Sequence, residues 1–398
     1  MRILHLSSLY APYAFGGAER VVQSLAEKSA GKGHAVAVAH LAPMPMPAGT
    51  RNGVEVYPLE HRNPLWIEES AKYPAPMRML NKVCTIININ TTHDIGRAID
   101  DFRPDIVHSH SMVELSPFAW ASAKRRHTRL VHTLHDYDLM CLRGALFKNG
   151  VRCAPRHLPC RISSRFKRGF HRHIDHVVGV SDAILQRHLG DGLFAHLPAD
   201  RRSVIWNPAP PITAATGRPA KAGDEIVFGF MGRLVAEKGV ELLLEACKGL
   251  PAAGWRLLIA GRAPASDEKF RQLAARMPVS FVGYVDPSEF LAGLDVLIVP
   301  SIWEEPFGLG VIEGYRAGIP VLGARIGGVE ELVRQIDPDW LFAAGDAGDL
   351  RRRMEDIVLR RRPLALSPAA VSTLLEQVSD EAVTDRYLAL YRGLLQQA

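Results

Sequence analysis

Hydrophobic runs of four to six residues alternate along this chain with longer stretches of helical spacing. Such runs at 2–6, 177–180, 226–231 and 296–299 are each followed by a Ser, Gly or Pro residue. Short, nearly continuous apolar runs between turn residues are typical of strands buried in a parallel sheet. Because segments with a helical period follow these strands, the pattern predicts an α/β fold with doubly wound sheets.

The same pattern places further elements along the chain. Helices are expected from about Ala18, over 240–250 and near the C-terminal end, whereas the stretch from Arg62 to Ile89 is less regular. Further strands are expected at 34–41, 53–58, 105–110, 131–135, 257–261 and 281–285, with another beginning at Val321.

The length of 398 residues allows two domains that each bury a core. A Pro- and Ala-rich segment without periodicity, 208–223, is interpreted as the linker between them. The predicted organisation is an N-terminal domain at 1–207, the linker, a C-terminal domain at 224–378 and a final helix at 379–398.

Composition indicates a globular chain, with 47% hydrophobic and 23% charged residues. No run of 18 or more apolar residues is present, so no membrane-spanning helix is expected. The apolar run at the N-terminus is too short for a signal peptide. These features predict a cytoplasmic location.

The net charge of +6 is unevenly distributed. Residues 1–207 hold 27 Lys and Arg against 17 Asp and Glu, and the remainder holds 21 against 25. A basic half favours an anionic partner, such as the inner face of the plasma membrane or a lipid-pyrophosphate acceptor. The alternative is a solvated basic surface with no partner. Nucleic acid is not expected as a partner.

Two carboxylates bracket the most informative stretch, 297–323. A buried strand ends at Pro300, a loop carrying Glu305 follows, and Gly308 precedes a short helix that carries Glu313. The carboxyl ends of strands are where open α/β sheets bind ligands. Carboxylates that accept hydroxyl hydrogens and bare amides at a helix N-terminus suit a polyhydroxyl, phosphorylated ligand.

The string EPFGLGVIE at 305–313, followed by AGIPV, resembles the Glu-x7-Glu signature of retaining nucleotide-sugar glycosyltransferases of family four. GRLVAEKG at 232–239 is similar to the GRLxxxKG string of the same family. The resemblance covers nearly the full chain. It implies the GT-B fold, in which two doubly wound Rossmann-like domains face a central cleft and the C-terminal helix crosses back to the first domain.

Arg233 and Lys238 flank the bend from a strand end to a helix start. A guanidinium and an ammonium there can clamp a pyrophosphate without a divalent ion. The resemblance implies that the C-terminal domain binds the nucleotide sugar, that the N-terminal domain binds the acceptor, and that neither a metal nor a cofactor is required. The catalytic residues it implies are His110, Glu305, Arg233 and Lys238. The donor-binding residues it implies are Gly16, Gly17, Arg233, Lys238, Gly283, Tyr284, Glu305, Phe307, Gly308 and Glu313.

Histidines end two of the predicted strands. His108 and His110 close one, and His135 closes the next. Strand-end histidines can donate or accept protons near pH 7. The resemblance favours His110 as the residue beside the donor sugar, with His135 as the second choice. A generic histidine at a strand end would more often be structural.

Three cysteines, Cys141, Cys153 and Cys160, cluster within twenty residues. Their spacing lacks a Cys-x2-Cys pair, so reduced thiols are favoured over a zinc site, which is left open. The segment 161–174 is predicted to be a basic amphipathic helix, with apolar residues every four positions from Ile162 to Ile174. It can lie on a membrane, or its apolar stripe can pack on its own domain.

The expected function is therefore retaining, metal-independent transfer of a hexose from a UDP- or GDP-sugar to a glycan or lipid-linked acceptor, in cell-surface polysaccharide or glycolipid assembly. Two alternatives are carried forward. One is a sugar-nucleotide epimerase of the same fold, which would need paired acid and base residues at the sugar. The other is a nucleotide-sugar-binding protein without catalysis.

Overall fold

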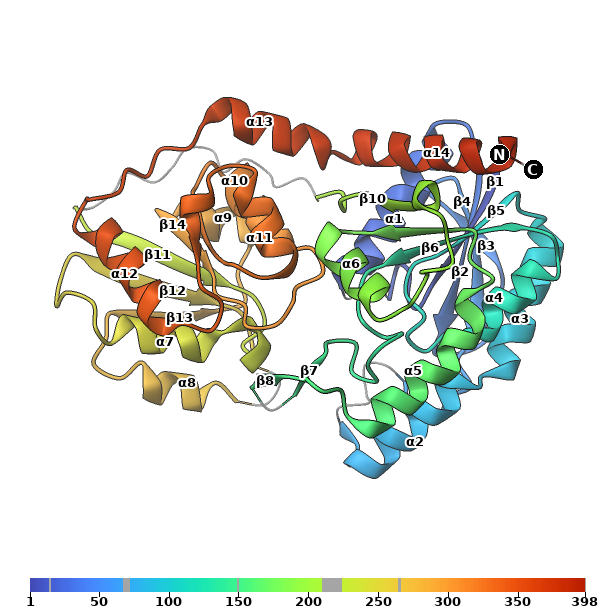
Figure 1. Ribbon diagram of the computed structural model, residues 1–398, viewed down its shortest axis with the longest axis horizontal. Coiled ribbons are helices and arrows are strands. Elements are labelled where there is room, and N and C mark those ends of the chain that lie inside the picture. Colours follow the sequence, from blue (N-terminus) through green and yellow to red (C-terminus); the bar gives the residue numbers. More distant parts are fainter. Residues whose placement is uncertain (14–15, 67–71, 149, 210–223, 264–265, 398) are drawn as a thin grey trace. The chain divides into compact units, whose positions relative to one another are not determined.

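The computed structural model describes residues 1–13, 16–66, 72–148, 150–209, 224–263 and 266–397. The chain forms two compact units (Figure 1). Unit 1 comprises 1–146, 153–208 and 378–398, and unit 2 comprises 147–152 and 209–377. Most of the predicted linker, 210–223, lies outside the described residues.

Unit 1 is built on a sheet with the strand order β10-β9-β6-β5-β1-β2-β4-β3. Neighbouring strands are parallel except β3 and β4, which form an antiparallel hairpin at one edge. The strands are β1 (Arg2–Ser7), β2 (Ala35–Ala42), β3 (Gly49–Arg51), β4 (Val54–Glu60), β5 (Ile106–Ser109), β6 (Arg129–Leu134), β9 (His176–Gly179) and β10 (Arg202–Val204). The helices are α1 (Gly17–Gly31), α2 (Ala75–Ile86), α3 (Ile89–Phe102), α4 (Phe118–Lys124), α5 (Leu158–His171), α6 (Asp182–Gly190), η2 (Ala199–Arg201) and α14 (Asp380–Gln396).

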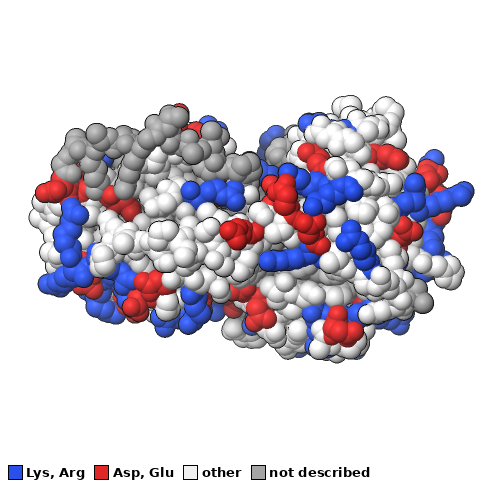
Figure 2. Space-filling model, turned by 90° about the horizontal axis from the view of Figure 1, so that it is seen from above, with Lys and Arg blue, Asp and Glu red and all other residues white. Residues whose placement is uncertain are grey.

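The C-terminal helix α14 packs on the sheet of unit 1, so both ends of the chain belong to this unit (Figure 1). Five of its apolar and aromatic side chains enter a core shared with β1, β5, β6 and β9. A buried polar contact also fixes the position of α14, because the Tyr391 hydroxyl lies 2.6 Å from Nδ1 of His108. At the surface, Lys28 pairs with Glu381 at 2.6 Å. Figure 2 shows basic and acidic side chains side by side on one face of the molecule. The core residues of α14 are Val383, Tyr387, Leu388, Tyr391 and Leu394.

Unit 2 is built on a wholly parallel sheet with the order β13-β12-β11-β14-β15-β16. Its strands are β11 (Ile226–Met231), β12 (Trp255–Ala260), β13 (Val279–Gly283), β14 (Val296–Val299), β15 (Val321–Ala324) and β16 (Leu341–Phe342). Its helices are η3 (Ala236–Lys238), α7 (Val240–Cys247), α8 (Glu268–Leu273), α9 (Pro287–Ala292), α10 (Leu309–Arg316), α11 (Gly327–Arg334), η4 (Pro338–Trp340), α12 (Ala347–Val358) and α13 (Pro368–Gln377).

Both sheets are doubly wound, which confirms the predicted fold class. In unit 2 the chain builds β11, β12 and β13 outward in one direction and then returns to place β14 on the other side of β11. Unit 1 repeats the arrangement, with β1 and β5 at the reversal. Open α/β sheets bind ligands outside the carboxyl ends of the strands at such a reversal. The fold therefore marks one edge of each sheet as a candidate site.

A small hairpin departs from the predicted domain boundary at 207. Strands β7 (Phe147–Lys148) and β8 (Val151–Arg152) group with unit 2, although the residues on both sides of them belong to unit 1. An ion pair of 3.2 Å joins Arg152 to Glu304. Two-residue strands have no readable periodicity, so the sequence pattern could not detect this excursion.

Among the described residues, no helix combines the length and hydropathy that crossing a bilayer requires.

Tyr391→Phe is expected to lower the stability of unit 1 by about 1–3 kcal/mol, because it leaves a nitrogen of the buried His108 without its partner. Urea denaturation followed by tryptophan fluorescence measures the loss. The matched control is Tyr73→Phe, at an exposed tyrosine, which should leave stability unchanged. Equal stability of the two variants would contradict a stabilising role for the contact between Tyr391 of α14 and His108 of β5.

Candidate active site

The reversal point of unit 2 brings two loops together. Strands β11 and β14 are paired in parallel, with Phe228 opposite Val296 and Gly229 opposite Leu297. The residues that follow these strands therefore emerge at the same edge of the sheet. One loop carries Arg233 and Lys238, and the other carries Glu305.

Backbone contacts hold these loops against each other. Gly239 has φ +75°, and a Cβ added there would lie only 1.8 Å from the carbonyl oxygen of Pro300. The N–H of Ile302 donates to the carbonyl oxygen of Glu237 at 3.0 Å. A residue without a side chain is required at Gly239, because only then can the two loops approach this closely.

This approach pairs Lys238 with Glu305. The ammonium lies 2.7 Å from Oε1 of Glu305, whose side chain is 9% exposed. The Ser301 hydroxyl donates to the same oxygen, and the Lys238 ammonium lies 5.9 Å from the centre of the Trp303 ring. Burial by itself would raise the pKa of Glu305, but the Lys238 charge and the Lys238 and Ser301 hydrogen bonds outweigh it and lower this pKa. Glu305 is therefore ionised at neutral pH.

Arg233 belongs to the same loop as Lys238 and lies between β11 and η3. It follows β11 directly and is exposed. Within the described part of the chain, its guanidinium makes no ion pair or side-chain hydrogen bond. A bidentate cation without a protein partner beside a second cation can bind a diphosphate.

The loop from Glu305 to Gly308 is held by the glycines that begin α11. The N–H of Gly328 donates to the carbonyl oxygen of Glu305 at 2.8 Å. A Cβ added to Gly328 would lie 2.3 Å from the carbonyl oxygen of Phe307. Gly308 caps α10 with φ +97°, a left-handed conformation that favours glycine. The Phe307 side chain is buried, so only its backbone can serve a ligand. Glu313 lies on α10 and is partly exposed.

Gly283 and Tyr284 lie farther along the same edge, at the end of β13. Gly283 has φ +73°, and Tyr284 is 74% exposed. The guanidinium of Arg262, which follows β12, lies 5.5 Å from the centre of the Tyr284 ring. Arg262 was missed at the sequence level, although Gly261-Arg262 repeats the Gly232-Arg233 pair at the end of the neighbouring strand.

In unit 1, Gly16 and Gly17 lie at the start of α1, as expected. The carboxylate of Glu19 folds over this terminus, because a Cβ on Gly16 would lie 2.5 Å from its Oε2. A carboxylate near a helix N-terminus is stabilised by the helix dipole. Glu19 therefore competes with any anion that would bind there.

His110 follows β5 at the reversal point of unit 1, but it is only 1% exposed. Both of its ring nitrogens are hydrogen-bonded to other histidines. Nε2 lies 2.9 Å from Nδ1 of His5, and Nδ1 lies 3.2 Å from Nε2 of His135. His135 is partly exposed and forms the outer end of this row. Burial lowers the pKa of His110 well below its usual value and lowers that of His5 to about 3. The row is therefore uncharged at neutral pH.

One group of three potential metal ligands lies close together among the described residues. Nitrogens of His5, His108 and His110 lie within 4.8 Å of one another, but both ring nitrogens of His108 are already shared with Tyr391 and Thr133. The thiol of Cys160 interacts with those of Cys141 and Cys153, and burial raises its pKa. A raised pKa opposes the thiolate form that binds zinc.

Comparison with known proteins decides the family. A family model for glycosyl transferases group 1 matches residues 225–359, and a model for the glycosyl transferase 4-like domain matches residues 16–208. The chain belongs to the glycosyl transferases group 1 family.

Two relatives illustrate what this glycosyltransferase is similar to. It is 29% identical over 395 residues to an uncharacterized 42.6 kDa protein in the cps region of Klebsiella pneumoniae, a match that covers 99% of this chain and 100% of that protein. It is 36% identical over 176 residues to the lipopolysaccharide core biosynthesis glycosyltransferase LpsE of Rhizobium meliloti, covering 42% of this chain and 50% of that protein.

Solved structures share the fold of the glycosyltransferase. Anabaena HepE in complex with UDP matches with a TM-score of 0.72 and 18% identity, covering 99% of this chain and 100% of that one. Sucrose-phosphate synthase from Thermosynechococcus elongatus matches with a TM-score of 0.73 and 20% identity over 100% of both chains. The two parallel sheets are therefore those of a GT-B fold.

Gly328→Ala in the glycosyltransferase is expected to displace the Glu305–Gly308 loop, because the new methyl group would overlap the Phe307 backbone. We expect a loss of about 1–3 kcal/mol of stability together with weaker nucleotide binding, measured by denaturation and calorimetry. Gly293→Ala is the control, since its nearest contact would be an ordinary 3.5 Å. Unchanged nucleotide binding in Gly328→Ala would show that this loop does not contribute to the nucleotide site.

The buried histidines predict acid sensitivity. Burial lowers the pKa of His5 from 6.5 to about 3 and that of His132 to about 4. Below pH 6.5 the unfolded chain binds protons at these positions and the folded chain does not. Stability should therefore fall with pH down to the folded pKa values, by about 1.4 kcal/mol per pH unit for each histidine. Denaturation at pH 7 and pH 5 measures the slope.

His5→Gln should make this slope shallower, whatever its effect on stability at pH 7. His93→Gln, at an exposed histidine, should leave the slope unchanged. An identical slope in both variants and the wild type would exclude His5 as its source.

Proposed function

We propose that the protein is a retaining, metal-independent hexosyltransferase that takes its sugar from a UDP- or GDP-sugar. The proposed acceptor is a glycan or a lipid-linked glycan, in the assembly of a cell-surface polysaccharide or glycolipid. Donor binding is assigned to unit 2 and acceptor binding to unit 1.

One observation carries the proposal, namely the Lys238–Glu305 pair at the reversal point of unit 2. Lysine has three N–H donors, of which Glu305 receives one. The remaining donors, with the guanidinium of Arg233, can bind the departing diphosphate. Charge that develops on a leaving group is stabilised most by cations already held in place, so these two residues carry the main catalytic role.

The carboxylates and amides supply the other contacts. In the proposal, Glu313 accepts hydrogen bonds from ribose hydroxyls, and Glu305 with the amides around Phe307 and Gly308 holds the sugar. Gly283 and the exposed Tyr284 serve the nucleotide base. Because Glu305 is already engaged by Lys238 and Ser301, it acts as a fixed acceptor and is not assigned as a nucleophile.

His110 is assigned a role beside the anomeric centre, exerted through His135. Both nitrogens of His110 are engaged and its side chain is buried, whereas His135 is partly exposed. A neutral imidazole at the outer end of this row can hydrogen-bond the donor sugar. His110 then orients the imidazole of His135.

The relatives support the proposed context. LpsE is named for lipopolysaccharide core biosynthesis, and the Klebsiella relative is encoded in a cps region. HepE has been solved with UDP and with UDP-glucose. We extend these to a nucleotide-sugar donor for this chain, and we propose a peripheral position at the inner face of the plasma membrane on the basis of the basic first half.

Two alternatives can be separated from transfer. An epimerase would change the sugar of a free nucleotide sugar, and a non-catalytic binder would change nothing. Wild type should release nucleoside diphosphate from the correct donor, either by slow hydrolysis or by transfer. A thermal-shift panel of UDP-, GDP- and ADP-sugars identifies that donor, because only a ligand that binds the folded state raises the melting temperature.

Lys238→Ala is expected to reduce kcat by about 10²–10³-fold, since it removes a positioned cation from the leaving diphosphate. The release of nucleoside diphosphate is the measurement. Lys248→Ala, at an exposed lysine paired with Glu245, is the control and should retain full activity. Normal turnover by Lys238→Ala would exclude the proposed binding of the departing diphosphate by Lys238.

A further inference from the structure

Helix α2 exposes most of its apolar residues and buries two polar ones, Asn81 and Thr85. Met77, Met79, Leu80 and Val83 are between 43% and 58% exposed. Asn81 is buried instead, and its Oδ1 accepts the N–H of Leu65 at 3.1 Å. A surface helix of a globular protein normally buries its apolar side, so α2 is inverted.

Helix α5 is inverted in the same way. Leu158, Ile162 and Phe166 are 40–63% exposed. The buried side holds Lys167, whose ammonium donates to the carbonyl oxygen of Asp138 at 2.7 Å and lies 3.2 Å from its carboxylate. Of the stripe predicted from Ile162 to Ile174, only the C-terminal part packs inward, with Ile174 buried. Cys160, Ser163 and Ser164 complete the buried side.

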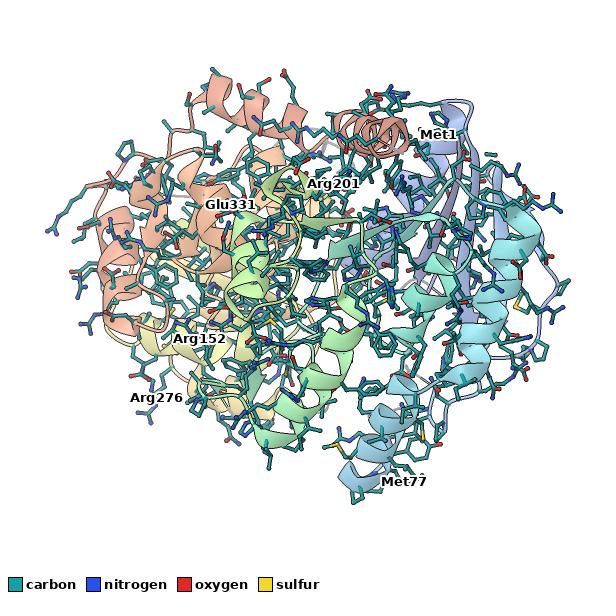
Figure 3. All side chains as sticks on the ribbon, turned by 45° about the vertical axis from the view of Figure 1, so that its right-hand side comes forward. Met1, Met77, Arg152, Arg201, Arg276 and Glu331 are labelled. Atoms are coloured by element: carbon teal, nitrogen blue, oxygen red, sulfur yellow. The ribbon has the colours of Figure 1, made fainter. Side chains whose placement is uncertain are left out.

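The two helices flank one cavity of about 70 Å³, lined by Lys82 and Ile86 of α2 and by Lys167 of α5. Figures 1 and 3 show both helices at the same end of unit 1, with Met77 at the free end of α2. Ten of the seventeen exposed large hydrophobic residues of the described chain lie in 73–89 and 158–166. We call this surface the α2/α5 face. Its apolar residues are Tyr73, Met77, Met79, Leu80, Val83, Ile87, Ile89, Leu158, Ile162 and Phe166.

The exposed charges of the two segments that form the α2/α5 face are basic, whereas their Lys82, Lys167 and Arg168 pair with Glu114, Asp138 and Asp191 of other segments. Residues 72–93 and 157–174 contain no Asp or Glu, but they contain three and five Lys or Arg residues. Arg78, Arg161 and Arg165 are exposed beside the apolar side chains. An apolar helix side bordered by cations is the pattern of helices that lie in the interface of an anionic membrane.

We propose that the α2/α5 face docks unit 1 onto an anionic lipid bilayer, with its apolar side chains among the acyl chains and its arginines at the lipid headgroups. The inference rests on the proposed function, whose membrane contact it assigns to named residues. Charge disfavours a second copy of this chain as the occupant, because two basic faces would repel each other. Neither helix is long enough to span a bilayer, so the contact is peripheral.

The test is sedimentation of the full chain with vesicles. One set contains phosphatidylglycerol and phosphatidylcholine in equal parts, and the other contains phosphatidylcholine alone. Binding to the first set and little binding to the second is expected, with binding to the first weakened by added salt. Equal binding to both sets, or to neither, would overturn the proposal.

Two variants locate the contact. Arg161→Glu with Arg165→Glu should weaken binding at least about 25-fold, since each cation near an anionic surface contributes about fivefold. Leu80→Glu with Ile162→Glu should also abolish sedimentation by placing charge on the apolar side. Because all four residues are exposed, thermal unfolding should remain that of the wild type.

The controls carry the same changes elsewhere. Arg276→Glu with Arg351→Glu, at exposed arginines of unit 2, matches the change in net charge. Met44→Glu with Leu359→Glu, at two exposed apolar residues outside the α2/α5 face, matches the apolar change. These variants should bind like the wild type. Equal losses in the controls would show that overall charge, and not the α2/α5 face, drives binding.

Donor hydrolysis without vesicles separates this inference from the proposed function. Loss of vesicle binding with intact hydrolysis in Leu80→Glu/Ile162→Glu supports the docking surface. Intact hydrolysis in a wild type that binds no vesicles overturns the docking surface alone. Concentration-dependent self-association that Leu80→Glu/Ile162→Glu removes, seen by analytical ultracentrifugation without vesicle binding, would assign the face to a second copy and also overturn it.

Discussion

A carboxylate removed from water must be matched by a cation or by hydrogen bonds, and in unit 2 this requirement joins Glu305 to Lys238. The two residues lie 67 positions apart on loops that follow neighbouring strands. The pairing depends on the parallel register of β11 and β14 and on glycines that let the loops approach. The same pair presents a cation at the edge where doubly wound sheets bind ligands. The arrangement of the two loops and the proposed chemistry thus share one contact.

Much of this edge could be predicted from the sequence, because its elements are local. The strands around 226–231 and 296–299 are short apolar runs. Gly308, directly before α10, is a glycine at a position with a left-handed backbone conformation. What could not be predicted is which side chains meet. Lys238 and Glu305 were assigned to different parts of the donor, and the structure shows them paired. Contacts between residues far apart in the sequence depend on packing that no local pattern contains.

The same reason explains the differences in unit 1. The resemblance favours His110 over His135, but the register of β1 and β5 pairs His5 with His108, two residues before His110, and His5 and His110 are hydrogen-bonded and buried. The sequence predicts that the apolar stripe from Ile162 to Ile174 either packs on its own domain or lies on a membrane. Helical periodicity shows that a stripe exists, but only the tertiary structure shows that Ser163, Ser164 and Lys167 occupy the inner side. Two doubly wound sheets therefore present different chemistry, a cationic edge in unit 2 and a neutral row of histidines in unit 1.

The most direct test of the central claim is a crystal structure of the protein with a nucleoside diphosphate bound. We expect phosphate oxygens within hydrogen-bond distance, about 2.7–3.2 Å, of the Lys238 ammonium and the Arg233 guanidinium, with the ribose near Glu313. Phosphates bound elsewhere, with the Lys238–Glu305 pair left without ligand contact, would contradict it.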